Sequence, residues 1–302
     1  MSELFRSTAS EIHARLKNGE ISPLDCLDAL EIRISQVESK VNALPTLCFD
    51  RARAHARALM KKPMGERGLL AGLPVPIKDL NDVAGVRSTQ GSPIYADRIA
   101  PTSDIMVTHL EKNGAIVYAM SNTPEFGAGA NTFNEVFGRT LNPWNTSRSA
   151  AGSSGGAAVA LATGTAWLAQ GSDLGGSLRN PASFCGVVGM RPSPGRVAAS
   201  VASKIDSTLG IEGPMARNVE DLALLFDAMV GEEPADPISL PSDGTSYLKA
   251  ARSGWKPKRV AISRDLGISP VDPEVADIVM KAARQFEQAG VIVEEAHPDF
   301  NE

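Results

Sequence analysis

The chain has 302 residues, of which 43% are hydrophobic and 22% charged, and 30 basic against 35 acidic side chains give a net charge of −5. These fractions are typical of globular proteins and exclude a disordered or low-complexity chain. Without a basic excess or a run of lysine and arginine, nothing in the sequence indicates a nucleic-acid or membrane-surface partner.

Helices are expected over residues 1–65. Capping residues accept hydrogen bonds from the first amides of a helix, and proline is favoured at its first position. The expected helix starts are, in chain order, the capping-box pair Thr8 and Glu11, Ser22 before Pro23, and Asp50 before a helix over 51–62.

Residues 66–231 have a different pattern, in which short apolar runs lie between turn residues. Runs of this length, bounded by glycine or proline, are typical of buried strands. The expected strands are 73–77, 115–120 and 187–190. Loops rich in glycine and serine are expected at 151–156 and 171–177, on either side of an alanine-rich helix over 157–168. The last element is an amphipathic helix from Asn218 to Gly231.

After a surface connection at 232–246, the sequence predicts a strand at 259–263, a helix from Asp272 to Gly290 and a strand at 291–294. This order is a βαβ unit, which implies parallel strands with a right-handed crossover. Strands that alternate with helices predict an α/β fold, with one mixed sheet covered by helices on both faces.

The three cysteines, Cys26, Cys48 and Cys185, form no CxxC pair, so neither a disulfide framework nor a zinc site is expected. The N-terminus lacks the basic start and apolar core of a signal peptide, and no window approaches the roughly 20 apolar residues of a membrane span. We therefore expect a cytoplasmic protein without a bound metal.

Two serine-containing loops could carry chemistry. Gly175 and Gly176 allow the backbone to direct several N–H groups towards one point, where they would hold the oxyanion formed when Ser177 attacks a carbonyl. A tight turn or a phosphate cradle would use the same residues. The sequence lacks GxxxxGK[ST] and a GxGxxG after a strand, which disfavours a nucleotide site.

The second loop, 152–156, formally matches G-x-S-x-G with Ser154 at its centre. A nucleophile elbow needs a strand before it and a histidine after it. The preceding residues 142–148 have loop composition, and His297 is the only downstream histidine. A serine hydrolase in this chain would therefore need another base.

Lys78 is the candidate base. It follows an apolar run that would bury its side chain, and burial disfavours the ammonium form. A neutral lysine amine can take a proton from a serine hydroxyl. The alternative is a buried lysine that pairs with Asp79 or Asp82.

Together these segments resemble the amidase signature family, a class of serine hydrolases that cleave amide bonds. The family patterns GGSSGG and G[ST]DxGGS[ILV]RxPA match 151–156 and 171–182, and P[VI]xxKD matches 74–79. Further stretches resemble the family in the same order: 122–126, 138–144, 186–192 and 213–217. The agreement of several motifs in identity, order and spacing is a stronger signal than any one of them.

The resemblance implies a role for each matching residue. Ser177 would be the nucleophile, Ser153 the bridging serine reached through a cis peptide from Gly152, and Lys78 the base. The backbone amides that would form the oxyanion hole are those of Leu174, Gly175, Gly176 and Ser177. The supporting positions are Gly152, Ser154, Asp173 and Arg179, of which Asp173 and Arg179 are expected to hold the loop in shape.

The resemblance also predicts the function and the domain organisation. The expected reaction is hydrolysis of a carboxamide C–N bond in a small-molecule amide, without a cofactor. Two alternatives stay open: the amidase subunit of a tRNA-dependent amidotransferase, with a glutaminase role, and a non-catalytic amidase-like fragment. A homodimer is also left open.

The sequence departs from the family in two respects. Ala151 stands where the family has glycine, and family members are commonly longer, so the chain is expected to lack a C-terminal portion that adds strands and cleft walls. A single amidase-signature domain is expected over 1–302, with an N-terminal helical segment at 1–65, a catalytic core at 66–231 and a βαβ extension at 247–302.

Overall fold

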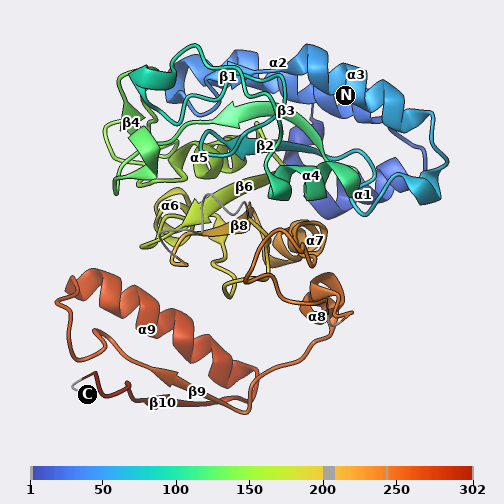
Figure 1. Ribbon diagram of the computed structural model, residues 1–302. Helices are drawn as coiled ribbons and strands as arrows, with labels where there is room; N and C mark the ends of the chain where they lie inside the picture. Colours follow the sequence, from blue (N-terminus) through green and yellow to red (C-terminus); the bar gives the residue numbers. More distant parts are fainter. Residues whose placement is uncertain (1–2, 200–207, 243, 301–302) are drawn as a thin grey trace. The chain divides into compact units, whose positions relative to one another are not determined.

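The computed structural model describes residues 3–199, 208–242 and 244–300 (Figure 1). The chain divides into two compact units, 1–249 and 250–302. Each unit is described by itself. In the described residues no helix is long and apolar enough to cross a membrane.

The described residues of the first unit form helices and short strands. Its α-helices are α1 (Ala9–Lys17), α2 (Pro23–Val41), α3 (Phe49–Met60), α4 (Ile105–Lys112), α5 (Gly155–Thr163), α6 (Arg179–Cys185) and α7 (Val219–Met229), and α8 (Tyr247–Arg252) spans the boundary between the units. Its strands are β1 (Thr46–Leu47), β2 (Pro74–Lys78), β3 (Ile116–Ser121), β4 (Phe133–Asn134), β5 (Gly138–Arg139), β6 (Leu168–Asp173), β7 (Val188–Gly189) and β8 (Ile211–Ala216).

The N-terminal helices begin close to where the sequence predicts. Thr8 caps α1 and Ser22 caps α2, each in a reciprocal capping box, which confirms both predictions. The prediction for α3 is wrong in one detail, because Cys48 is the N-cap and Asp50 lies in the first turn. The helix begins earlier because Phe49 is buried, with its ring centroid 5.7 Å from that of a core tyrosine.

The strands around the site form two three-stranded ladders, β1-β3-β2 and β6-β8-β7. β2 and β3 are parallel, with α4 between them in the chain, whereas β8 is antiparallel to both of its neighbours. β2 and β6 lie side by side (Figure 1). Between these two strands the backbone amide of Lys78 donates to the side chain of Gln170 at 2.9 Å. The mixed sheet expected from the sequence is therefore present as two ladders linked by a side chain.

The sequence prediction missed β6 and β8. The predicted helix over 157–168 ends at Thr163, because Gly164 adopts a left-handed conformation with φ 76°. The predicted loop at 171–177 begins inside β6, whose residues include a glycine, a serine and an aspartate. Polar and small residues in a strand conceal the alternation that marks strands in a sequence.

Helix α5 fixes the position of the first serine loop. It is fully buried from Gly155 to Leu161 and contacts β2, β3, β6 and β8. A Cβ atom at Gly156 would lie 2.3 Å from the backbone nitrogen of Asn122, so only glycine allows this approach. Because α5 begins directly after Ser154, its close packing places the serine loop against the ends of β2 and β6.

The second unit is a small βαβ motif. β9 (Arg259–Ile262) and β10 (Ile292–Glu295) are parallel and are connected by α9 (Pro273–Gln288), which Asp272 caps. This confirms the predicted βαβ order. Ile262, Met280 and Ala283 form a buried apolar cluster, with Val293 packed against it.

Candidate active site

Lys78 lies at the end of β2 and is completely buried. Its Nζ is 2.7 Å from Ser153 Oγ and 3.0 Å from Ser172 Oγ. The preceding residues of β2 are all buried, so the strand carries the lysine into the interior. The structure therefore brings together two of the three residues that the family motifs single out, Lys78 and Ser153.

Burial lowers the pKa of Lys78 to about 7, while the carboxylates of Glu212 and Asp173 act in the opposite direction. The alternative pairing of Lys78 with Asp79 or Asp82 is wrong. The Asp79 carboxylate accepts hydrogen bonds from the amide and hydroxyl of Thr89, and Asp82 pairs with Arg98. A lysine with this pKa can exist as the neutral amine near pH 7, which is the form that accepts a proton.

Ser153 is 3% exposed and follows a cis peptide bond from Gly152, as the resemblance implied. The side chain of Thr132 is hydrogen-bonded to the backbone of the loop around Ser153. The Thr132 hydroxyl donates to the carbonyl of Ala151 at 2.9 Å and accepts from the amide of Gly155 at 3.0 Å. Both ends of the loop are thus fixed by one side chain.

Ser154 lies in the interior and connects the two serine loops. Its hydroxyl donates to the carbonyl of Ser172 at 3.1 Å and accepts from the amide of the same residue at 3.2 Å. Its own amide donates to the carbonyl of Ser177 at 3.2 Å. A fully buried hydroxyl with these partners does not fit an exposed nucleophile elbow.

Ser177 lies between β6 and α6 and is partly exposed. Its carbonyl accepts the hydrogen bond from Ser154, so its backbone is close to the first loop. Within residues 3–199, 208–242 and 244–300, its hydroxyl makes no hydrogen bond, to Ser153 or to any other residue. The structure brings the Ser177 backbone to the site and leaves the side chain without a fixed partner.

Asp173 holds the loop that contains Ser177. Its carboxylate accepts from the amides of Gly176 at 2.8 Å and Leu178 at 3.1 Å, from Arg179 Nε at 3.0 Å and from Arg191 Nη1 at 3.2 Å. Burial raises the pKa of Asp173, but Arg179 and the two amides outweigh it and lower the pKa to about 2. The carboxylate is therefore charged at any physiological pH.

The four amides predicted to form the oxyanion hole are not equivalent. The amide of Gly176 already donates to Asp173, and Gly176 has φ 124°, a conformation that favours glycine. The amides of Leu174, Gly175 and Ser177 donate no hydrogen bond in the part of the chain that the structure describes. These three are the amides available to an oxyanion.

Five residues at the site were not assigned a role from the sequence: Thr132, Gln170, Ser172, Arg191 and Glu212. Ser172 and Arg191 lie inside stretches that match the family patterns, so their position in those motifs was an available signal. Gln170 and Glu212 lie in the two strands that the sequence prediction missed. Nothing local in the sequence indicates that they meet.

Among the described residues, no group of three or more histidine, cysteine, aspartate or glutamate side chains could hold a metal ion.

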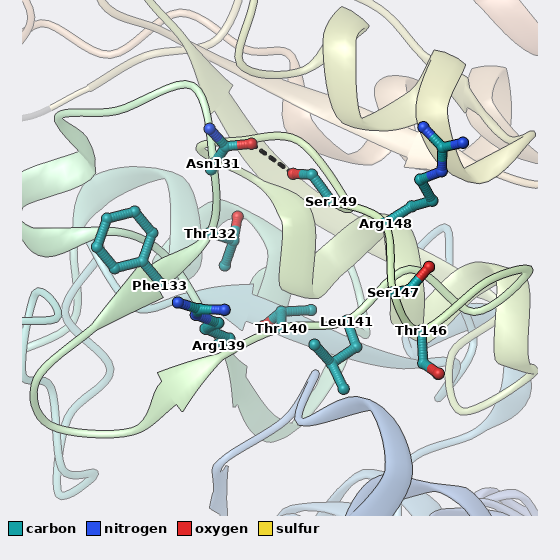
Figure 2. Close-up of a pocket in the computed structure, with 10 residues that line it drawn as sticks. All are labelled: Asn131, Thr132, Phe133, Arg139, Thr140, Leu141, Thr146, Ser147, Arg148 and Ser149. Carbon is teal, nitrogen blue, oxygen red and sulfur yellow. Dashed lines mark hydrogen bonds between the residues drawn. The ribbon is translucent and has the colours of Figure 1, made fainter.

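A separate pocket of about 300 Å³ lies beside the first serine loop (Figure 2). Thr132 and Thr140 contribute to its lining, and Asn131 and Ser149 are joined there by a hydrogen bond. Lys78, Ser153 and Ser177 do not line it, so it is distinct from the Lys78–Ser153 site.

Known sequences match almost the whole chain. A family model described as "Amidase" matches residues 25–301. The chain is 39% identical over 295 residues to a glutamyl-tRNA(Gln) amidotransferase subunit of Moorella thermoacetica, covering 97% of this chain and 61% of that protein. It is 38% identical over 297 residues to an acylamidase of Rhodococcus erythropolis, covering 97% and 62%. The chain thus spans about three fifths of the length of these relatives.

Solved structures also match almost the whole chain. A bacterial aryl acylamidase of the amidase signature enzymes superposes with a TM-score of 0.89 at 32% identity, covering 96% of this chain and 61% of that one. 6-Aminohexanoate cyclic dimer hydrolase, solved with its substrate, superposes with a TM-score of 0.87 at 29% identity, covering 98% and 61%. These superpositions confirm the predicted mixed α/β fold. Because the family model matches residues 25–301 of the 302 residues, the chain belongs to the amidase family, that of the amidase signature enzymes.

Proposed function

We propose that this chain carries the catalytic residues of an amidase, which hydrolyses a carboxamide C–N bond through an acyl-enzyme on Ser177. The observation that carries the proposal is the buried contact between Lys78 Nζ and Ser153 Oγ, at 2.7 Å. A lysine whose pKa is lowered to about 7 by burial is suited to act as a base near neutral pH. Family membership supports the same reaction class.

In the proposed mechanism, neutral Lys78 takes a proton from Ser153, which takes the proton of Ser177. The Ser177 oxygen forms a bond to the carbonyl carbon, and the negative charge moves to the carbonyl oxygen. As the C–N bond breaks, the relay returns the proton to the nitrogen of the leaving amine. Water then attacks the acyl ester with the same residues as base, which releases the acid and restores Ser177.

The oxyanion would be held by the amides of Leu174, Gly175 and Ser177. Donors that point at the developing charge before the reaction lower the barrier, and loss of one such donor costs on the order of 10²–10³ in turnover. The amide of Gly176 would contribute only if it left Asp173, so we assign it to the support of the loop.

We further propose that the two compact units are parts of one amidase-signature domain. The family match extends from residue 25 to residue 301 and so includes residues of both. We also propose that the substrate is a small-molecule amide and that the protein is cytoplasmic. A homodimer stays a prediction.

Covalent labelling tests the nucleophile directly. A fluorophosphonate probe should label the chain at Ser177, and peptide mapping by mass spectrometry identifies the modified serine. Ser177→Ala and Lys78→Ala should abolish labelling while the thermal unfolding curve shows a folded protein. Labelling that persists in Ser177→Ala would contradict the assignment. A folded wild-type chain that is never labelled would favour the non-catalytic alternative.

A second candidate is the amidase subunit of a tRNA-dependent amidotransferase, favoured by the 39% identity to a glutamyl-tRNA(Gln) amidotransferase protein. Such a protein works with partner chains, so the two candidates differ in what accompanies the protein. Co-purification of the natural protein with amidotransferase partners, together with glutaminase activity, would favour this candidate. Turnover of simple amides by the isolated protein, without glutaminase activity, would favour the hydrolase.

A further inference from the structure

A cluster of three polar side chains lies behind Lys78, where β2 and β6 meet. Gln170 on β6 accepts a hydrogen bond from the Lys78 amide through Oε1 at 2.9 Å. Gln170 Nε2 donates to Asn81 Oδ1 at 3.0 Å and to Glu212 Oε2, and Asn81 Nδ2 donates to Glu212 Oε1 at 3.3 Å. Asn81 Nδ2 also donates to Asp104 Oδ2 at 3.1 Å, and Gln170 Nε2 to the carbonyl of Gly171 at 3.0 Å. The cluster meets Lys78 at its backbone amide.

The Glu212 carboxyl group orients the side chain of Gln170. Its two oxygens accept from Gln170 Nε2 and Asn81 Nδ2, so both amide side chains turn their NH₂ groups towards it. With its NH₂ group turned to Glu212, Gln170 directs its oxygen to the Lys78 amide. In place of a backbone ladder between β2 and β6, this side chain fixes the end of β2. Gln170 is fully buried, so water does not compete for these bonds.

Glu212 also affects the pKa of Lys78 through its charge. Its charge raises the pKa of Lys78 against the effect of burial, more than the charge of Asp173 does. Asp173, at the end of β6, is also held by two ion pairs, with Arg179 and Arg191. Of these two carboxylates, Glu212 on β8 has the larger effect on the pKa of Lys78.

The charges that act on the pKa of Lys78 are those of Glu212 and Asp173. Helix α2 also packs against β2, and its charged residues are not among the causes of the shift: Asp25, Asp28, Glu31, Arg33, Glu38 and Lys40. Helix α5, over Gly155–Thr163, contains no titratable residue. The Tyr118 hydroxyl of β3 donates to the carbonyl of Thr165, and burial raises the pKa of Cys26 in α2 to about 12, so both stay neutral. After β2, Asp104 accepts from the side chain of Asn81 at 3.1 Å, and burial raises its pKa.

We propose that Glu212, acting through Gln170 and Asn81, is a positioning residue that fixes Lys78 against Ser153 and sets the pH range in which Lys78 accepts a proton. This inference rests on the proposed role of Lys78 as the base. Glu212 does not touch the reacting atoms; its effect passes through the backbone and the charge of the lysine.

Direct titration of Lys78 tests the inference without turnover. The chain is labelled with ¹³C at lysine Cε, the Lys78 signal is assigned from its loss in Lys78→Arg, and its chemical shift is followed against pH. In Glu212→Gln the midpoint should move to lower pH by about one pH unit, because an attractive charge has been removed. The matched control is Glu111→Gln, which removes a half-buried glutamate that pairs with Arg51 at 2.8 Å, and it should leave the midpoint unchanged.

The rate of fluorophosphonate labelling against pH gives the second measurement. In Glu212→Gln the acid limb of the profile should move with the Lys78 midpoint. Glu212→Asp keeps the charge but shortens the side chain, so its midpoint should stay near the wild-type value while the plateau rate falls several-fold. This variant also tests the positioning role if Glu212→Gln does not fold.

The outcomes separate the inference from the proposed function. A folded Glu212→Gln chain with the wild-type Lys78 midpoint, or a Glu212→Asp chain with both wild-type midpoint and plateau rate, overturns the role of Glu212. A midpoint that moves as expected in a chain whose Ser177 is never labelled supports the effect of Glu212 on Lys78 and contradicts the proposed function.

Discussion

The two serine loops of the site are held in opposite ways. In the first loop, Ser153 is buried and its hydroxyl is bonded to Lys78, so the side chain itself is fixed. In the second, Asp173 binds the backbone around Ser177 through the amides of Gly176 and Leu178, while the Ser177 hydroxyl is left partly exposed. The difference suits the proposed roles, in which Ser153 relays a proton in a fixed geometry and Ser177 must reach a substrate.

The largest expected effect separates the two serines. Ser177→Ala should abolish fluorophosphonate labelling, because the reacting oxygen is gone. Ser153→Ala should keep the nucleophile and slow labelling by about 10²–10⁴-fold, the range of general base catalysis. Stopped-time labelling followed by intact mass measures both rates. Equal loss in the two variants would mean that the comparison between relay and nucleophile does not hold.

The next effect tests the support of the second loop. Asp173→Asn keeps the shape of the side chain but removes the charge that Arg179 and Arg191 neutralise. Both arginines keep contact with water, so the main cost is a buried backbone amide that loses its acceptor to the new NH₂ group. This costs about 1–3 kcal/mol, and the free energy of unfolding in urea should fall by that amount. Ser177→Ala is the control, with a change within about 0.5 kcal/mol. A change in Asp173→Asn as small as that of the control would show that the loop does not depend on the charge of Asp173.

The pH dependence sharpens the assignment of the first loop. Lys78 must be neutral to accept a proton, and its pKa is lowered to about 7. The labelling rate should therefore rise with pH through about 7 and fall about tenfold per pH unit well below that value. Measurement of initial labelling rates between about pH 5 and about pH 9 checks this. A rate that does not change over this range would remove Lys78 from the relay.

The smallest effect concerns the contact between the loops. Ser154→Ala removes the hydroxyl that bonds the amide and the carbonyl of Ser172. Loss of a buried hydrogen bond that leaves its partners unsatisfied costs about 1–3 kcal/mol, and we expect the lower end because only a hydroxyl is removed. Urea denaturation measures this, and labelling of Ser177 should persist. Loss of labelling in a stable Ser154→Ala chain would show that Ser154 takes part in the chemistry.

Elements with strong local signals were predictable. The capping boxes at Thr8 and Ser22, the buried runs that became β2 and β3, and the βαβ order after residue 250 all agree with the structure. Each depends on neighbours in the sequence, such as a hydroxyl and a carboxylate three residues apart. β6 and β8 were missed because glycine and polar residues occupy positions that only the surrounding layers bury.

The candidate site was predictable only in part. The motifs identify Lys78, Ser153 and Ser177 because their residues match a family pattern, and the structure brings Lys78 to Ser153. Gln170 and Glu212 were not predictable, because they meet only when β6 pairs with β8 and lies beside β2.

The sequence by itself determined the α/β class, the starts of the first two helices and the side chains proposed to react, since these follow from residue type and spacing along the chain. The tertiary structure alone decided which hydrogen bonds they make. Lys78 is hydrogen-bonded to two serines and not to Asp79, and Gly176 donates its amide to Asp173. Glu212 accepts from the Gln170 side chain that bonds the Lys78 amide. The reason is that burial and charge act between residues far apart in the chain, so the pKa of Lys78 is a property of the packed strands and not of the motif around it.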